Sequence, residues 1–235
     1  MNEHISSAYD RDLEGLVTLI MKMGGLVEEA ILDAAKSLET QDIELAEIVR
    51  RKDKAIDALE LEVNDVAATV IALRAPVSKD LRIILTVLRL AGSLERIGDH
   101  AKNIAKRTSA LIDMPNSSSS NSSLRRMSRE VQVMLKDVLD AYVRGDAELA
   151  EDVRQRDHEV DQMYNTLFRE FLTFMMEDPR NITACMHLHF MAKNVERMGD
   201  LATNMAEQVI YLVTGDMPED ARPKGDETSF VRTPD

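Results

Sequence analysis

The pentapeptide Glu95-Arg-Ile-Gly-Asp99 recurs 101 residues later as Glu196-Arg-Met-Gly-Asp200, and this pair decides the organisation of the chain. Upstream of each copy lie a proline, an Asp-xxx-Asp motif and a short acidic segment. These matched segments follow in the same order in both halves: Asp42–Glu47 with Asp146–Glu151, Asp53–Asp57 with Asp157–Asp161, and Pro76 with Pro179. Four ordered matches indicate an internal duplication.

The residues between the prolines are typical of helices. Apolar side chains recur three or four positions apart, as in Leu90, Leu94 and Ile97. Only 4% of residues are aromatic and no proline precedes Pro76, which favours long helices over a sandwich or barrel. The sequence therefore predicts an all-α fold of two tandem three-helix bundles. The expected helices span about 6–39, 43–73, 79–112, 124–144, 147–177 and 180–215.

The duplication also predicts the domain boundaries. The first bundle would cover residues 1–113 and the second 124–214. Between them, residues 114–123 read Met-Pro-Asn-Ser-Ser-Ser-Ser-Asn-Ser-Ser, which is typical of a flexible linker. Residues 215–235 are rich in proline, glycine and charge, so we expect a disordered tail. Asp42, Ser78 and Asp146 are the predicted helix N-caps.

Composition excludes several classes of protein. A net charge of -13 disfavours binding to nucleic acid or to anionic lipid. The single cysteine, Cys185, lies in an apolar helical run and is expected to be packing rather than a nucleophile. The polar, acidic N-terminus is unlike a signal peptide, and no apolar run approaches the roughly 18 residues of a membrane span. We therefore expect a cytoplasmic protein without membrane insertion.

Carboxylates four residues apart lie on one helix face, and each half contains two such pairs. The pairs lie at nearly equal distances before and after Pro76, and likewise around Pro179, so folding back at each proline brings them level on antiparallel helices. We expect these acids to face outward or to line a groove rim. The predicted clusters are Asp53, Asp57, Glu95 and Asp99 in the first repeat, and Asp157, Asp161, Glu196 and Asp200 in the second.

Carboxylates that converge repel one another and need a cation to balance their charge. The sequence leaves open whether lysine side chains or metal ions supply it. A salt-bridge network with Lys54, Lys102 or Lys106 would make the protein a metal-free helical scaffold. Alternatively, all-oxygen ligation would favour magnesium, manganese, calcium or iron. A carboxylate-bridged metal oxidase is disfavoured because no glutamate is followed by a histidine three residues later. No Walker A, GxSxG or HExxH enzyme signature occurs, and no phosphate site is evident in so acidic a chain.

Over residues 3–214 the sequence resembles the PhoU family. The resemblance rests on the two pentapeptides, which match the family's E/D-xxx-D signature, and on His4-Ile-Ser6, Met21–Gly25 and Phe174–Asp178. It implies two symmetric three-helix bundles, a homodimer, and iron or zinc clusters held by the eight carboxylates named above. Tyr164 replaces the equivalent of Glu60, so the two sites would differ if Glu60 assists a metal.

The resemblance also implies a function without catalysis. Proteins of this family are adaptors that negatively regulate phosphate-starvation signalling, the Pho regulon, and modulate the Pst phosphate transporter. The partners implied are the sensor histidine kinase PhoR and the transporter ATPase PstB.

Overall fold

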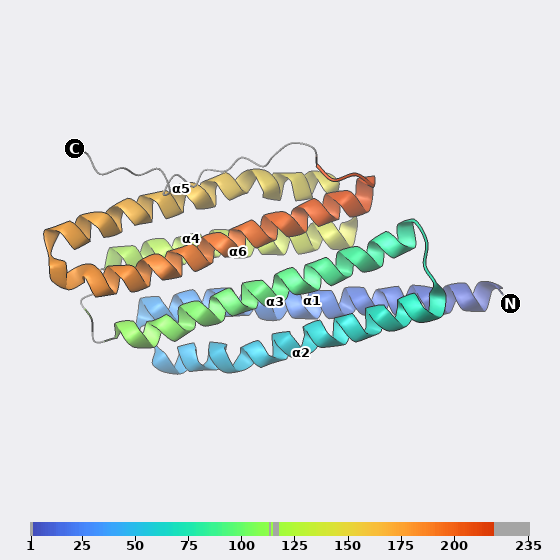
Figure 1. Ribbon diagram of the computed structural model, residues 1–235, viewed down its shortest axis with the longest axis horizontal. Coiled ribbons are helices and arrows are strands. Elements are labelled where there is room, and N and C mark those ends of the chain that lie inside the picture. Colours follow the sequence, from blue (N-terminus) through green and yellow to red (C-terminus); the bar gives the residue numbers. More distant parts are fainter. Residues whose placement is uncertain (1, 113, 115–117, 219–235) are drawn as a thin grey trace.

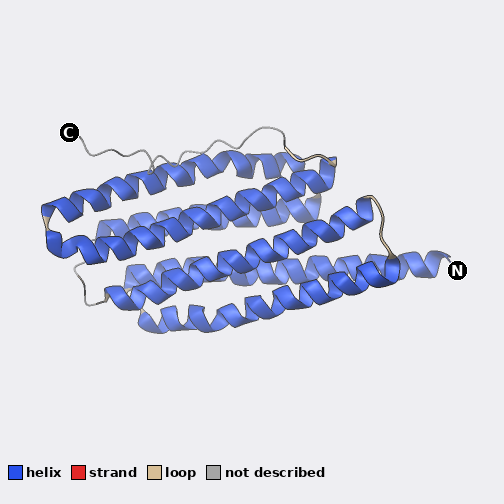
Figure 2. Cartoon of the chain, viewed as in Figure 1, coloured by secondary structure: helices blue, strands red, loops and turns tan. Residues whose placement is uncertain are grey.

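A computed structural model describes residues 2–112, 114 and 118–218, and the elements within these ranges are helical (Figure 2). The all-α prediction is therefore confirmed. The helices are α1 (Asn2–Thr40), α2 (Ile43–Arg74), α3 (Lys79–Leu111), α4 (Ser118–Arg144), α5 (Ala147–Glu177), the 3₁₀ turn η1 (Pro179–Asn181) and α6 (Ile182–Thr214).

The helix ends are set by the residues that the sequence suggested, with one exception. Asp42 accepts a hydrogen bond from the Leu45 amide at 2.9 Å, and Asp146 caps α5 in the same way. Gly215 ends α6 in the left-handed region, with a φ of 96°. The prediction that Ser78 caps α3 is wrong: its side chain makes no capping hydrogen bond.

The six helices run along one long axis, and the two bundles lie side by side (Figure 1). In the first bundle α1, α2 and α3 pack together, and in the second α4, α5 and α6 do. Between the bundles α1 packs against α4 and α3 against α6. Helices α2 and α5 therefore lie on opposite outer sides of a central group of four helices.

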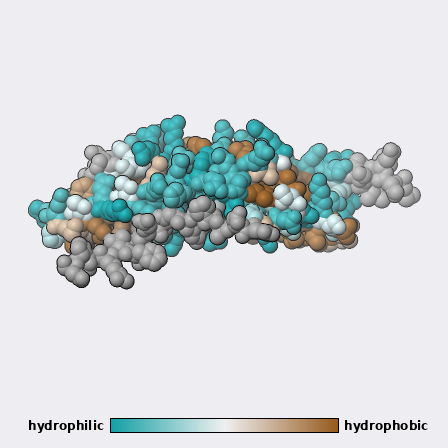
Figure 3. Space-filling view, turned by 90° about the horizontal axis from the view of Figure 1, so that it is seen from above, coloured by the Kyte–Doolittle hydropathy of each residue, from teal (hydrophilic) through white to brown (hydrophobic). Residues whose placement is uncertain are grey.

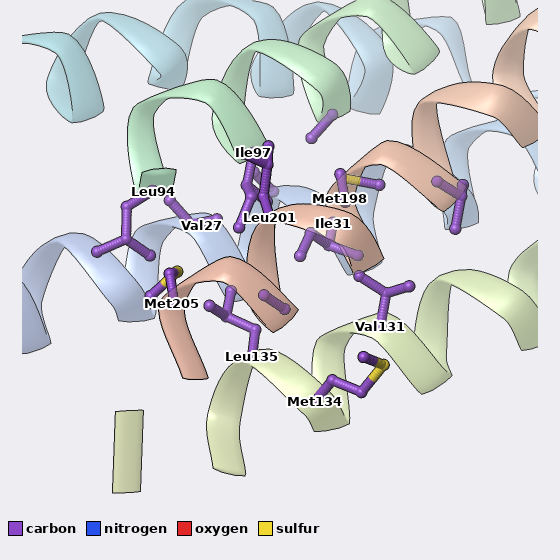
Figure 4. Packing of buried hydrophobic residues seen from close by; sticks show 14 of the residues in the cluster. Val27, Ile31, Leu94, Ile97, Val131, Met134, Leu135, Met198, Leu201 and Met205 are labelled. Atoms are coloured by element: carbon purple, nitrogen blue, oxygen red, sulfur yellow. The ribbon is translucent and has the colours of Figure 1, made fainter. Parts of the chain in front are cut away.

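The buried core is continuous across both repeats. Figure 4 shows Val27, Ile31, Leu94 and Ile97 of the first bundle meeting side chains of α4 and α6, among them Leu135. Each of these residues is at most 1% exposed, and they belong to one hydrophobic cluster that spans both halves. Cys185 is buried at the edge of this cluster, as the sequence predicted.

The surface is mainly polar. The face in Figure 3 is largely hydrophilic, with hydrophobic side chains in small separate areas. Within the described residues, none of the helices combines the length and the apolar character that crossing a bilayer requires.

The predicted linker is corrected in its second half. Helix α4 begins at Ser118, so residues 118–123 are helical. Ser120 and Asn121 are buried, and the Ser120 hydroxyl donates a hydrogen bond to Glu170 of α5 at 2.8 Å. This tertiary contact favours the helix although serine and asparagine are weak helix formers. Residues 115–117 and the predicted tail from residue 219 lie outside the described residues.

A short insertion tests whether the helical part of this segment, which begins at Ser118, contributes more to stability than the part before it. Gly-Ser-Gly-Ser inserted between Ser120 and Asn121 is expected to lower the melting temperature by about 2–4 °C for each kcal/mol of stability lost, because it displaces the buried first turn of α4. The same insertion after Asn116, ahead of the helix, is the control and should change the melting temperature little, since lengthening a loop costs only about 0.6 kcal/mol per doubling. Equal effects at both places would contradict the structural role of Ser120.

Candidate functional site

A glycine in each pentapeptide lets two helices approach at the level of the carboxylates. A Cβ atom at Gly98 would lie 3.0 Å from Ile56 Cδ1 of α2 and 3.6 Å from Asp53 Oδ1. A Cβ at Gly199 would lie 3.3 Å from Asp157 Oδ1 of α5. A methyl group at either position would require these neighbouring side chains to shift by a few tenths of an ångström. Each pentapeptide therefore lies against the Asp-xxx-Asp motif of the neighbouring helix, so the predicted alignment of the acidic motifs is confirmed in both repeats.

In the first repeat a lysine joins the two acidic motifs. Lys102 Nζ lies 2.5 Å from Asp53 Oδ2 on α2 and 3.1 Å from Asp99 Oδ1 on α3. Asp53 is only 3% exposed, and its other oxygen, Oδ1, has no hydrogen-bond partner among the described residues. The salt-bridge alternative is therefore realised here through Lys102, with one buried carboxylate oxygen left over.

The charges of the first cluster act strongly on one another. Burial raises the pKa of Glu95, and the negative charges of Asp99, Glu60, Asp57 and Asp53 raise it further. The pKa of Asp53 is also raised, mainly by burial and against the opposing effect of Lys102. Glu60 therefore joins the four predicted carboxylates as a charge that acts on Glu95.

The second cluster is more deeply buried than the first. Asp157, Asp161 and Glu196 are 2%, 5% and 6% exposed, and Asp200 is half-buried. Lys193 Nζ donates a hydrogen bond to Glu196 Oε1 at 2.8 Å, whereas Glu196 Oε2 has no hydrogen-bond partner among the described residues. Burial raises the pKa of Glu196, Lys193 lowers it, and the charges of Asp200 and Asp161 raise it again.

The expected outward orientation of the acids is therefore only partly right. Asp57, Glu95, Asp99 and Asp200 are half-buried and so keep part of their surface in solvent, but Asp53, Asp157, Asp161 and Glu196 are buried. The physical reason is the close helix contact at Gly98 and Gly199, which brings the neighbouring helix over Asp53 and Asp157. The spacing of residues along one helix cannot predict this contact, because the contact joins two helices.

The two clusters also use different lysines. Thr203 occupies the position in the second repeat that Lys102 occupies in the first, and Gly92 is the counterpart of Lys193. Lys193 also lies over the ring of the buried Tyr164, 4.9 Å from its centroid. Sequence reasoning missed Lys193, although its position three residues before Glu196 is the signal that could have found it.

The residues of the two carboxylate clusters fit a metal site only in part. Among the described residues, no group of three or more histidine, cysteine, aspartate or glutamate side chains is placed to hold a metal ion. Yet the clusters offer oxygen ligands suited to hard cations, and Asp53 Oδ1 and Glu196 Oε2 are buried without hydrogen-bond partners. An ion could replace the ammonium groups of Lys102 and Lys193 if those side chains turned away.

Protonation of three carboxyl groups in the clusters is expected to contribute stability to the metal-free protein below neutral pH. The folded-state pKa values of Asp53, Glu95 and Glu196 are raised, mainly by burial, so the folded chain binds more protons than the unfolded chain just above pH ~4. This stabilisation is lost as the pH rises through the raised values. Thermal unfolding of metal-free protein at several pH values checks it, and Glu196→Gln should flatten the dependence. Wild type that loses more stability than Glu196→Gln on mild acidification would contradict the predicted sign.

The fold and these clusters define a class of protein: a duplicated three-helix-bundle protein with paired carboxylate motifs in each repeat. Comparison with known families gives the same division, because the PhoU domain matches the chain twice, at residues 20–108 and 124–209. The chain belongs to the PhoU family. This family is regulatory and accessory rather than a known family of enzymes.

Individual relatives match nearly the full chain. The phosphate-specific transport system accessory protein PhoU homolog of Rhizobium meliloti is 45% identical, covering 97% of this chain and 96% of the relative. The homolog of Caulobacter vibrioides strain NA1000 / CB15N is 44% identical, over 96% and 98%. The crystal structure of PhoU from Pseudomonas aeruginosa, 38% identical, has a TM-score of 0.84 and covers 88% of this chain and 100% of that chain. These likenesses support an accessory role in phosphate transport.

Proposed function

We propose that this protein is a cytoplasmic adaptor that restrains phosphate-starvation signalling, the Pho regulon, when phosphate is abundant, and modulates the Pst phosphate transporter. Its partners would be the sensor histidine kinase PhoR and the transporter ATPase PstB, and it would act as a homodimer. The observation that carries the proposal is the match to accessory proteins of phosphate-specific transport over almost the whole of both chains. The continuous core supports it, because six long helices packed around one core offer long faces to two partners.

Genetic complementation tests this function. In a bacterium that lacks its own PhoU-family gene, the protein is expected to lower a phosphate-starvation reporter at high phosphate and leave it active at low phosphate. Pull-down experiments should recover the kinase and the transporter ATPase, with recovery depending on the phosphate concentration. A reporter that stays fully active at high phosphate, with neither partner recovered, would contradict the proposal.

The carboxylate clusters are the proposed metal-binding part of this adaptor. Asp53, Asp57, Glu95 and Asp99 would supply oxygen ligands in the first repeat; Asp157, Asp161, Glu196 and Asp200 would do so in the second. Manganese, magnesium, iron and zinc are the candidate ions. The buried oxygen atoms of Asp53 and Glu196 that lack hydrogen-bond partners support this assignment.

A metal-free scaffold is the competing function, and a specific observation favours it. Lys102 bridges Asp53 and Asp99, so a cation supplied by the chain already neutralises the first cluster. In that case the lysine would be the permanent counter-ion. Elemental analysis of protein purified without chelators or an affinity tag separates the two functions.

A further inference from the structure

The contact between α3 and α6 carries a row of arginines, most of which have partners across the contact. Arg89 donates a hydrogen bond to Gln208 at 2.8 Å, and Arg82 contacts the Tyr211 carbonyl oxygen at 3.4 Å. Further along, Arg107 lies over the Phe190 ring, 4.5 Å from its centroid. These pairs hold the two helices together from end to end.

The middle of this contact is different, because two arginines there have no partner. A cleft of about 300 Å³ is lined by Arg96, His100, Arg197, Asp200, Leu201 and Asn204. Within the part of the chain that the structure describes, neither Arg96 nor Arg197 makes a hydrogen bond or an ion pair, and both side chains are exposed. Two guanidinium groups thus line one small cleft in a chain whose net charge is -13.

The imidazole of His100 lines the same cleft as the two arginines. His100 forms a 2.8 Å hydrogen bond with Asn194 of α6, which fixes its ring at the cleft. Two guanidinium groups against one carboxylate, that of Asp200, give the cleft lining an excess of positive charge, although the protein as a whole is acidic.

We propose that this cleft binds a tetrahedral oxyanion of the phosphate type between the guanidinium groups of Arg96 and Arg197, with the Asn204 amide as a further donor. Planar guanidinium groups can each give two hydrogen bonds to such an anion, and a dianion offsets their mutual repulsion. Asp200 opposes the anion electrostatically and keeps binding weak. This proposal departs from the expectation drawn from the sequence, which rested on the net charge of the chain and not on the charges at one place.

The position of the cleft connects it with both repeats. Arg96 lies between Glu95 and Asp99 in the first pentapeptide, and Arg197 occupies the equivalent place in the second. An anion held by both arginines would therefore join α3 to α6 at the centre of the molecule. This inference goes beyond the proposed adaptor function and holds whether or not the carboxylates bind metal.

Binding of inorganic phosphate to the full chain, measured by calorimetry at low ionic strength, tests the site. Metals are first removed with a chelator that is then dialysed away. Wild-type protein is expected to bind phosphate, and Arg96→Gln and Arg197→Gln should each weaken binding by about tenfold, the loss of a charge-assisted pair. Asp200→Asn should strengthen it. Arg89→Gln, an equally exposed arginine of α3 outside the cleft, is the matched control and should bind like wild type.

Further measurements identify the anion and exclude unfolding as the cause of weaker phosphate binding. Phosphate should raise the melting temperature of wild type and not of the double variant Arg96→Gln/Arg197→Gln, which should melt no lower than wild type without phosphate. A nonhydrolysable nucleotide that binds more tightly than phosphate would identify a terminal phosphoryl group as the ligand. Absence of phosphate and nucleotide binding to wild type, an equal loss in Arg89→Gln, or equal binding of glutamate would overturn the proposal.

Discussion

Replacing Asp99 with alanine is expected to reduce the metal bound per chain by about half, because it removes a ligand from the first cluster only. The double variant Glu196→Ala/Asp200→Ala should remove the other half. Bound metal is measured by elemental analysis of protein purified without a chelator or an affinity tag. The wild-type melting temperature should rise when Mn²⁺ or Fe²⁺ is added, since an ion at a hundredfold its dissociation constant stabilises the folded state by about 2.7 kcal/mol.

The same variants behave differently if the lysines are the only cations. Without metal, Asp99→Ala leaves Lys102 paired with the buried Asp53, so stability should change little. Glu196→Ala removes a buried carboxylate that has one oxygen without a hydrogen-bond partner, and stability should hold or rise slightly. A wild-type protein that carries no metal and shows no metal-dependent shift would rule out the clusters as metal sites. The adaptor function would survive that result.

Replacing Gly24 with leucine is expected to destabilise the whole molecule by about 1–3 kcal/mol relative to the same change at Gly25. Gly24 is a buried residue of α1, and a Cβ there would lie 2.4 Å from Leu139 Cδ1 of α4. The end of the Leu139 side chain could turn away from one methyl group, but a full leucine would force the two bundles apart. The adjacent Gly25 is exposed and has nothing within 4 Å of its Cβ position.

Chemical denaturation of both variants measures this difference, and the shape of the transition carries further information. Because the core is continuous, wild type should unfold in one cooperative step, and Gly24→Leu should shift the midpoint of that step. Gly25→Leu should be neutral or slightly stabilising, since leucine is the better helix former. Two separate transitions in wild type, or equal effects of the two substitutions, would show that the bundles are independent domains.

Most of the fold could be predicted from sequence because it depends on local interactions. The N-caps at Asp42 and Asp146 and the end of α6 at Gly215 follow from hydrogen bonds within one or two turns. The alignment of the acidic motifs follows from their nearly equal distances to Pro76 and to Pro179. Short loops leave neighbouring helices little choice but to pack antiparallel, so counting residues was sufficient.

Where local preference and tertiary contact disagree, the sequence alone gave the wrong prediction. Residues 118–123 consist mainly of serine, whose helix propensity is low, yet they form the first turns of α4. Ser120 is buried and bonded to Glu170, which is 50 positions away in the chain. The composition of residues 118–123 cannot predict a contact with a residue so far away in the chain.

The sequence by itself determined the helices, their duplication and the eight carboxylates that converge in pairs of motifs. The tertiary structure alone decided that the bundles share one core, that Lys102 and Lys193 serve different clusters, and that Arg96 and Arg197 meet at one cleft. The reason is physical. Helix periodicity and caps act over a few residues, whereas the contact of α3 with α6 depends on how side chains of two distant segments fit together, and this fit determines which charges become neighbours.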